Sequence, residues 1–476
     1  MDNNSKGSAG LRPLIRAAVV RHAGLTCGHA RTGSARRAVS PSSGACAAGG
    51  GRARSGPRIS LSGWTAAGAG RSDGCAHVRG EPRMETEHRV STLELFFDLV
   101  FVFTITQLTV LLADDLTPRG AGQVVLIFTV LFWMYGGYAH LTNQVPPDRT
   151  VRRVLLMLAM GAFMVCALAV PTAFGAGGVA FGLGYLLVVL VHGALFTQAH
   201  GRGVLWFALP NVLCALAVTA AGFFDGLPAW GLWLLALLLQ FVTPVVVQRV
   251  AASGAAAEPE VPEQTVGDQL GGMNAAHLVE RHGLLLIIVF GESVIAIGIG
   301  VGSLPLSAGI AGGAFLALTI ASAMWWMYFV RDEGRAEEVF AHTPPERRFK
   351  LAMSAYYYAF LPVLLGIAVF AAGVKKTIGH LGEHLHTGPA VALAGGVALY
   401  LAGNLVFRAV LGLGPARYRA TALVLALATV PVGTGWTGAG QLVALAVVLV
   451  CAVVAEGGRS PASGARETAA ESVTGS

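Results

Sequence analysis

The chain has 476 residues, of which 54% are hydrophobic and only 12% are charged, and its formal net charge is +7. Soluble globular domains carry about 25% charged residues, so this composition argues against an ordinary cytosolic enzyme. Residues 1–83 contain thirteen Lys or Arg and three acids, whereas the rest of the chain contains 20 basic and 23 acidic side chains. The basic character therefore belongs to the N-terminal segment, and the remaining chain is slightly acidic.

Residues 1–83 are rich in Gly, Ala, Ser and Arg and show no sustained apolar period, so a disordered leader is expected. An Arg- and Ser-rich leader with few acids is typical of an organelle transit peptide. Alternatively, translation begins at Met84, and the upstream residues come from an over-extended reading frame. The leader lacks the interleaved aromatic residues of a nucleic-acid-binding arm, and no nucleic-acid partner is expected.

Apolar runs recur after the leader, each of about 17 to 23 residues, the length that crosses roughly 30 Å of hydrocarbon as a helix. Continuous runs such as LLLIIVFGESVIAIGIG exclude the alternating strands of a membrane barrel. The sequence therefore predicts an all-α polytopic transmembrane helix bundle in contact with a lipid bilayer. Twelve spans are expected, at 95–113, 121–139, 153–171, 176–196, 204–222, 230–248, 283–301, 308–329, 351–373, 390–410, 419–434 and 439–455.

The connections between these spans differ strongly in charge. With a cytoplasmic N-terminus, the cytoplasmic connections contain fourteen Lys or Arg, and the connections on the opposite side contain three. Positive charge concentrates in cytoplasmic loops of membrane proteins. Both chain termini are therefore expected in the cytoplasm.

Residues 251–279 form a polar connection that includes AASGAAAEPEVPEQ and is typical of a cytoplasmic linker. It separates a first six-helix half, 84–250, from a second, 280–455, and residues 456–476 are expected to be a disordered tail. Six is an even number, so both halves enter the membrane in the same direction. If the halves are repeats, they are parallel repeats about an axis along the membrane normal. FFDLV at 96–100 and FGESV at 290–294 support this hypothesis.

Acids within the spans are the first candidates for function, since a charge in hydrocarbon costs about 2.5–3.5 kcal/mol on insertion scales. Glu94 and Asp98 are spaced i, i+4 and share a helix face near the cytoplasmic edge. Glu292 lies nine residues beyond Gly283 and is therefore about 13 Å deep. Its depth makes Glu292 the best functional candidate.

A polar cluster is predicted where the first and seventh spans begin, because both start at the cytoplasmic face. Arg281 lies about 16 Å from Glu292 along the helix axis, too far to pair with it. Glu94 or Asp98 is instead expected to pair with Arg281 or His277. The end of the second span brings further polar residues to this face: Tyr138, His140, Asn143 and Asp148.

Three functions remain open for this cluster. The first is a transporter or channel-like protein for a small ion or solute, with Asp98 and Glu292 in the pathway. The second is a membrane-state sensor or scaffold, in which the polar residues only lock the helices together. The third is a membrane-embedded lipid-modifying enzyme that uses Glu94, Asp98, His277 and Arg281. No nucleotide, dinucleotide, GxSxG or HExxH motif and no metal-ligand spacing of Cys and His occurs, so no cofactor or metal is expected.

Four segments resemble the bacterial low temperature requirement A proteins: LELFFDLVFVFTITQL at 93–108, YGGYAHLTN at 135–143, HLVERHGLLLIIVFGESVIAI at 277–297 and WWMYF at 325–329. The resemblance runs in order from about residue 92 to 455. It implies a multi-pass bacterial plasma-membrane protein named for growth in the cold, and it implies no known substrate. The positions of this chain that match the motifs are Glu94, Phe97, Asp98, Gln107, His277, Glu280, Arg281, Gly283, Gly291 and Glu292.

One position departs from that family, whose members often have His before the Leu-Pro of the ninth span, where this chain has Phe360. The first span is also weakly similar to the Phe-Ser-Asp motif of potassium channels built from six-helix repeats. Here Phe97 replaces the serine, and the second half has FGE at 290–292. These two differences weaken the similarity to a channel.

Overall fold

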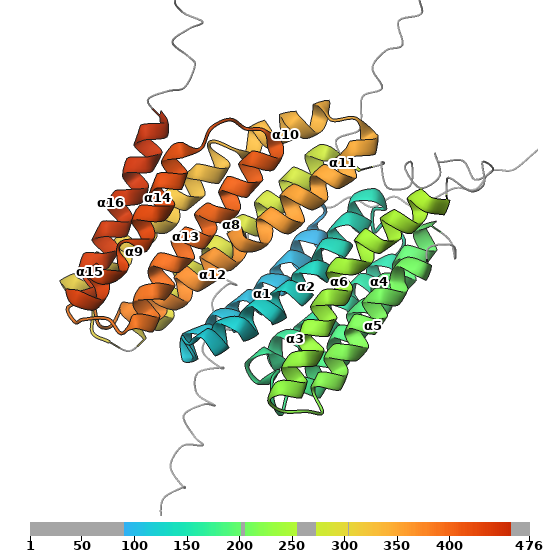
Figure 1. Ribbon diagram of the computed structural model, residues 1–476, viewed down its shortest axis with the longest axis horizontal. Coiled ribbons are helices and arrows are strands. Elements are labelled where there is room, and N and C mark those ends of the chain that lie inside the picture. The colour runs from blue at the N-terminus through green and yellow to red at the C-terminus, as the bar shows by residue number, and fades with distance from the viewer. Residues whose placement is uncertain (1–89, 201–204, 255–272, 303, 458–476) are drawn as a thin grey trace, which may run out of the picture. The chain divides into compact units, whose positions relative to one another are not determined.

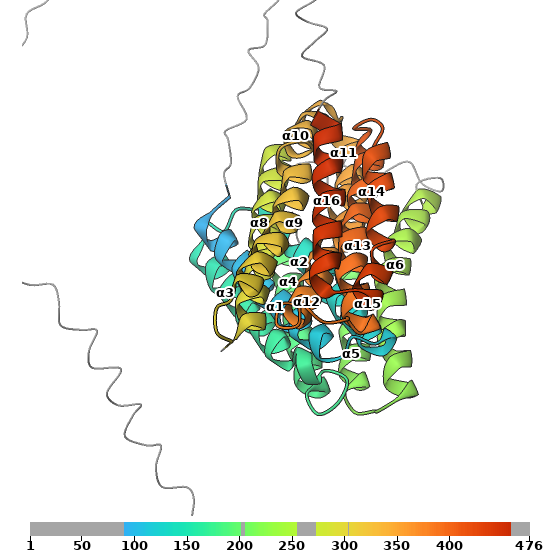
Figure 2. The same cartoon turned by 90° about the vertical axis from the view of Figure 1, so that its left-hand side faces the viewer.

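The computed structural model describes residues 90–200, 205–254, 273–302 and 304–457, all within the compact unit Glu81–Ser476. Every regular element in these described ranges is a helix, as Figure 1 and, from a second side, Figure 2 show. The predicted leader lies outside the described residues, as do most of the predicted linker and nearly all of the predicted tail.

The helices that precede the predicted linker are α1 Thr92–Asp114, α2 Pro118–Gln144, α3 Thr150–Ala169, α4 Gly178–His200, α5 Leu205–Ala221 and α6 Leu227–Gly254, with the short turn η1 Val170–Thr172 after α3. The long helices that follow it are α8 Ala275–Val301, α9 Ala308–Phe329, α12 Phe360–Thr377, α13 Thr387–Leu411 and α16 Gly438–Gly457. Shorter elements complete this part: α10 Glu333–His342, α11 Pro345–Ala352, the π-helical turn η3 Met353–Ala359, α14 Arg417–Leu427 and α15 Val430–Gly435.

The predicted all-α membrane bundle is confirmed, because nine helical stretches of the described residues are long and apolar enough to cross a bilayer. The described parts of α5 and α6 add two shorter apolar helices. The eleventh predicted span, 419–434, differs from the prediction, since it is divided into α14 and α15. Pro431 lies in the first turn of α15, where its missing N–H cannot continue the hydrogen bonds of α14.

The helices of the two predicted halves have corresponding neighbours. In the first half, α1 packs on α3, α3 on α4, α4 on α5, α5 on α6, and α2 on α6. In the second half, α8 packs on α12, α12 on α13, α13 on α14, α14 on α16, and α9 on α16. The two groups meet where α1 packs on α8 and α12, in the middle of the bundle in Figure 1.

Helices α12 and α13 lie so close together that their backbones touch. A Cβ atom added to Gly396 would overlap the backbone nitrogen of Phe370, and one added to Gly366 would overlap that of Tyr400. Small residues at such positions permit close packing of helices in a membrane, where burial of apolar surface gives little driving force. The second half is therefore built around this glycine-lined contact.

Replacing Gly396 with valine is expected to force α12 and α13 apart. Overpacking of a tight contact costs about 1–3 kcal/mol, so the variant should unfold at a clearly lower temperature in detergent than the unmodified protein. The matched control is Gly395→Val on the same helix, because a Cβ at Gly395 meets only the tip of Val391, 4.0 Å away. Equal unfolding temperatures for the two variants would contradict the proposed role of this contact.

The outer surface of the bundle is apolar. Large hydrophobic side chains are exposed on several helices, among them Leu168 on α3, Val424 on α14 and Val454 on α16, each about two-thirds exposed. Because exposing so much apolar surface to water would be costly in free energy, these side chains face the lipid hydrocarbon.

Candidate functional site

Helices α1 and α8 begin side by side, and each start is fixed by a capping residue. Ser91 caps α1: its Oγ accepts a hydrogen bond from the Glu94 backbone N–H (3.3 Å), and the Glu94 carboxylate accepts one from the Ser91 N–H (2.9 Å). This capping box turns the Glu94 side chain back over the first turn. Asn274 caps α8 by accepting a hydrogen bond from the His277 N–H (3.1 Å).

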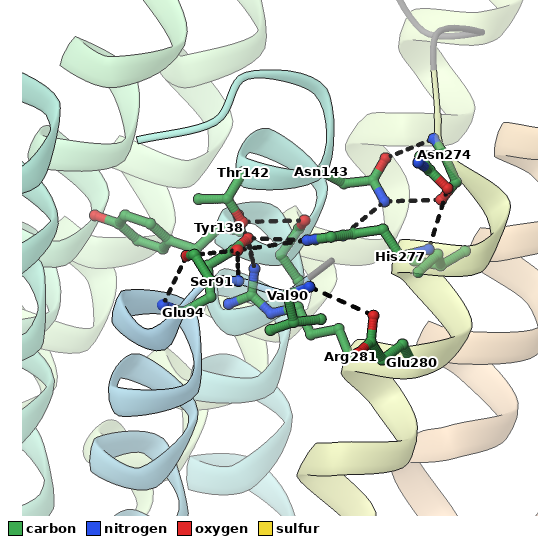
Figure 3. Close-up of polar contacts among 12 residues, drawn as sticks. Val90, Ser91, Glu94, Tyr138, Thr142, Asn143, Asn274, His277, Glu280 and Arg281 are labelled. Atoms are coloured by element: carbon green, nitrogen blue, oxygen red, sulfur yellow. Dashed lines mark hydrogen bonds and ion pairs between the residues drawn. The ribbon is translucent and has the colours of Figure 1, made fainter. Parts of the chain in front are cut away.

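Arg281 of α8 lies at the centre of the site and is only 1% exposed. Its guanidinium contacts both acids of α1: Nη1 lies 3.1 Å from Glu94 Oε1, and Nη2 lies 3.0 Å from Asp98 Oδ1. Nε donates a third hydrogen bond to Asp98 Oδ1 (3.3 Å), and Nη1 also donates to the Thr142 hydroxyl of α2. Figure 3 shows Arg281 approaching Glu94 and Thr142 from α8. The contact that the sequence predicts between the acids of the first span and Arg281 is therefore present.

Two aromatic rings enclose the guanidinium. The Arg281 Cζ atom lies 5.9 Å from the ring centroid of Phe97 and 5.7 Å from that of Tyr135, within the range of cation–π contacts. The Tyr135 hydroxyl donates a hydrogen bond to Asp98 Oδ1 (2.9 Å), and Phe163 packs edge-on against Phe97. The ions therefore interact in an apolar setting, where their attraction is stronger than in water.

His277 is held by Asn143 in a defined tautomer. Asn143 Oδ1 accepts a hydrogen bond from the Asn274 N–H (2.9 Å), and Nδ2 donates to the Asn274 carbonyl (2.9 Å), so the amide can point only one way. The same Nδ2 lies 3.1 Å from His277 Nδ1, which must accept. The ring proton is then assigned to Nε2, which lies 3.4 Å from the Glu94 carboxylate.

Two predicted residues of α2 hold helices together near the cluster. Tyr138 is buried, its hydroxyl donates to the carbonyl of Val188 in α4 (2.8 Å), and its ring packs on Phe97 at 5.1 Å. His140 is half-buried, and its ring lies 5.2 Å from that of Phe349 in α11.

Other predicted residues lie away from Arg281. Glu280 is exposed, and its carboxylate accepts a hydrogen bond from the Val90 N–H (3.4 Å). Asp148 is exposed beyond the end of α2. Gln107 is half-buried in α1, and no hydrogen bond of its side chain is found in the described ranges. The buried site is thus smaller than the predicted set.

Glu292 forms a second site between the same two helices, farther from their N-terminal ends. It is 1% exposed, and its Oε2 accepts a hydrogen bond from the Thr106 hydroxyl of α1 (2.7 Å). Thr106 lies eight residues beyond Asp98, or about 12 Å along α1. Since Asp98 pairs with Arg281 and Thr106 with Glu292, the contacts advance in the same direction on both helices, and α1 and α8 are parallel. One turn beyond the ion pair, the residues on these faces are apolar and buried: Val102 and Leu285.

A further buried ionic cluster was not predicted. Asp332, which follows α9, pairs through Oδ1 with Arg408 of α13 and through Oδ2 with Arg419 of α14. Arg419 also pairs with Glu456 of α16: Nε lies 2.9 Å from Oε1, and Nη2 donates to Oε2 (3.1 Å). Asn404 completes the cluster by contacting Asp332 and Arg419. The fourteen Lys or Arg that the sequence analysis assigns to cytoplasmic connections include both arginines, although the i, i+4 spacing of Asn404 and Arg408 signals a shared polar face.

A small cavity lies beside the first cluster, between α2, α3 and α4. Its volume is about 20 Å³, which is the space that one water molecule needs. Thr142, which contacts Arg281, is one of its walls; the others are Leu141, Val145, Pro147, Arg152, Leu156 and Leu195. A lipid head group does not fit into this space.

Apolar helices of bilayer length around buried ion pairs define a polytopic helical membrane protein. The family model of the bacterial low temperature requirement A protein matches residues 89–454, and the chain belongs to this family. It is similar to an uncharacterized protein of Rhizobium meliloti (strain 1021), with 27% identity over 324 residues that cover 67% of this chain and 76% of that protein. No solved structure matches the chain.

Proposed function

We propose that this protein moves a small ion or solute across the bacterial plasma membrane, with Asp98 and Glu292 in the pathway. The observation that carries the proposal is the presence of two buried carboxylates at different depths in one interface, between α1 and α8. Acids within membrane helices are costly and mark ion or proton pathways in pumps and transporters. The second cluster lacks this arrangement, because its acids lie together at one level and pair with two arginines.

The position of Glu292 supports the same proposal. Helices α1 and α8 open the two predicted halves, 84–250 and 280–455, whose corresponding neighbours support parallel repeats. Transporters built from repeats bind substrate near the membrane midplane, where the repeats meet. The contact between Thr106 and Glu292 lies at such a meeting point.

The orientation of the bundle follows from the charge of its connections. Of the fourteen Lys or Arg assigned to one side, Arg281, Arg408 and Arg419 are buried in ion pairs inside the bundle. The other eleven still outnumber the three on the opposite side, so we place both termini in the cytoplasm. The cluster around Arg281 then lies near the cytoplasmic face, and Glu292 lies deeper in the membrane. An ion that enters from the cytoplasm would meet Asp98 before Glu292.

The conformation described here is closed to ions, since Asp98, Arg281 and Glu292 are at most 1% exposed. Exchange with water therefore requires α1 and α8 to separate, as expected of a protein that opens its site to one side at a time. The lipid-modifying alternative needs space for a head group beside Glu94, His277 and Arg281, and the small cavity beside Thr142 does not supply that space in this conformation. A sensor or scaffold is the outcome if no flux is found.

Flux into proteoliposomes tests this function. Glu292→Gln keeps the shape of the side chain and the hydrogen bond from Thr106, and it removes the charge. We expect the variant to insert normally and to lose about tenfold or more in rate, which corresponds to a barrier raised by about 1.4 kcal/mol. Uptake of protons, Na⁺ and K⁺ would be measured separately.

The matched control is Glu338→Gln, which removes an exposed glutamate of α10. It should leave the rate unchanged. If Glu292→Gln transports as fast as the unmodified protein, Glu292 is not in the pathway. If the unmodified protein moves none of the tested ions or solutes, the transport proposal is wrong, and the sensor hypothesis replaces it.

A further inference from the structure

The geometry points to Asp98 as the carrier of an exchangeable proton on its Oδ2 atom in the closed conformation. This inference deepens the proposed function by naming the proton as the ion that binds at the Asp98 carboxylate. Only its consequence for transport rests on that function, because the occupancy of Oδ2 can be measured without any flux.

The charges of the first cluster do not balance. Among the described residues, Arg281 is the one cation in contact with two carboxylates, Glu94 and Asp98. If both acids are ionised and His277 is neutral, one negative charge stays uncompensated in an apolar setting. A buried unpaired charge is so costly that the group normally binds a proton instead.

His277 is not the site of this proton. Its Nδ1 faces the amide Nδ2 of Asn143 at 3.1 Å, and that amide is fixed by its two hydrogen bonds to the backbone of Asn274. Protonation of Nδ1 would place an N–H group against the Asn143 amide hydrogens. Nδ1 is therefore an acceptor, and the ring hydrogen is assigned to Nε2, which faces Glu94.

Glu94 is not the site either, because donors occupy both of its oxygens. Oε2 accepts from the Ser91 N–H (2.9 Å) and from the Ser91 hydroxyl (2.8 Å), while Oε1 accepts from Arg281 Nη1 (3.1 Å). A proton on either oxygen would displace one of these donors. Glu94 is thus built to stay ionised as the partner of Arg281.

The two oxygens of Asp98 differ sharply. Oδ1 accepts hydrogen bonds from the Tyr135 hydroxyl (2.9 Å) and from Arg281 Nε (3.3 Å) and Nη2 (3.0 Å). Oδ2 is buried and has no hydrogen-bond partner within the described ranges. A proton added to Oδ2 displaces no donor and leaves Glu94 and Arg281 as a balanced pair. An unpaired buried hydroxyl costs less than an unpaired buried charge.

A metal cation fits this position less well than a proton. Metal cations such as Ca²⁺ and Mg²⁺ require about six or more oxygen ligands, and the free position here is a single oxygen. Nowhere in the described ranges do three or more His, Cys, Asp or Glu side chains gather around a common point that could hold a metal ion. The groups that face Asp98 are Glu94 on its own helix, Tyr135 of α2 and Arg281 of α8.

Infrared spectroscopy of the protein in lipid vesicles tests the inference, since a protonated carboxyl has a C=O stretching band that a carboxylate lacks. We expect one component of this band to disappear in Asp98→Asn. It should also disappear in Glu94→Gln, because Asp98 then becomes the sole counter-ion of Arg281 and must ionise. Asp332→Asn is the control and should keep the component, because Asp332 pairs through both oxygens with arginines. Glu292→Gln identifies any separate component from Glu292.

The stability of Asp98→Asn gives an independent readout. Asparagine mimics the protonated acid and keeps an acceptor for Tyr135 and Arg281, so we expect an unchanged unfolding temperature. Retention of the whole band in Asp98→Asn or in Glu94→Gln would overturn the inference, as would strong destabilisation by Asp98→Asn. Failure of the transport proposal is distinguishable, because the unmodified protein would then show no flux while the band behaved as expected.

Discussion

Replacing Arg281 with methionine is expected to lower the free energy of unfolding by about 3–5 kcal/mol, the range for removing one partner of a buried ion pair. The variant keeps Glu94 and its neighbour Asp98 in an apolar setting without their cation. Thermal unfolding in detergent and the yield of folded protein in membranes would both fall. Arg335→Met serves as the control, because Arg335 is exposed on α10.

A second substitution separates the loss of charge balance from the loss of packing. Adding Glu94→Gln to Arg281→Met removes the uncompensated charge, so the double variant should recover a large part of the lost stability. Such a double-mutant cycle measures the coupling between the two side chains directly. Unfolding of Arg281→Met at the same temperature as the unmodified protein would contradict the description of this cluster.

Replacing Arg419 with methionine is expected to cost a similar amount, about 3–5 kcal/mol. Arg419 is fully buried and joins Asp332 and Glu456, and its Nη2 also donates to the Met327 carbonyl (3.0 Å). Its removal leaves two acids with Arg408 as the remaining cation of the cluster. The measurement is again the unfolding temperature, here compared with that of Arg417→Met two residues earlier, whose side chain makes no ion pair within the described residues.

The Arg419 cluster is expected to contribute to stability but not to transport, and a second substitution tests this. In the Arg419 cluster, Glu456→Gln should recover part of the stability of Arg419→Met, because it restores one cation to one acid. Protein that folds should then transport at the normal rate, since the cluster lies outside the α1–α8 interface. Loss of flux in a stably folded Arg419 variant would show that the second cluster also belongs to the pathway.

Much of this architecture follows from the sequence, because apolar runs of bilayer length have one structural solution. The pairing of Glu94 and Asp98 with Arg281 was predictable for a simple reason: both helices start at the same face, and the i, i+4 acids point one way. The separation of Glu292 from the Arg281 cluster along the same helix also follows from their spacing of eleven positions.

Other features depend on which helix faces meet. Membrane helices are apolar on all sides, so the spacing of their apolar residues does not show which face packs against a neighbouring helix. The partner of Glu292, Thr106, could not be identified for that reason. Glu280 directly precedes Arg281 and belongs to the same sequence motif, but its side chain is exposed. Arg408 and Arg419 were counted as loop charges, because the sequence alone does not distinguish an arginine that lies in a cytoplasmic loop from one near a helix end that forms a buried ion pair.

The most direct test of the account is proton uptake into proteoliposomes under an imposed membrane potential, followed with an enclosed pH-sensitive dye. Vesicles that contain the unmodified protein should take up protons faster than protein-free vesicles. Asp98→Asn should fall to the rate of protein-free vesicles while keeping its unfolding temperature, and Glu338→Gln should behave as the unmodified protein does. Equal uptake by Asp98→Asn and the unmodified protein, or no uptake by either, would contradict the account.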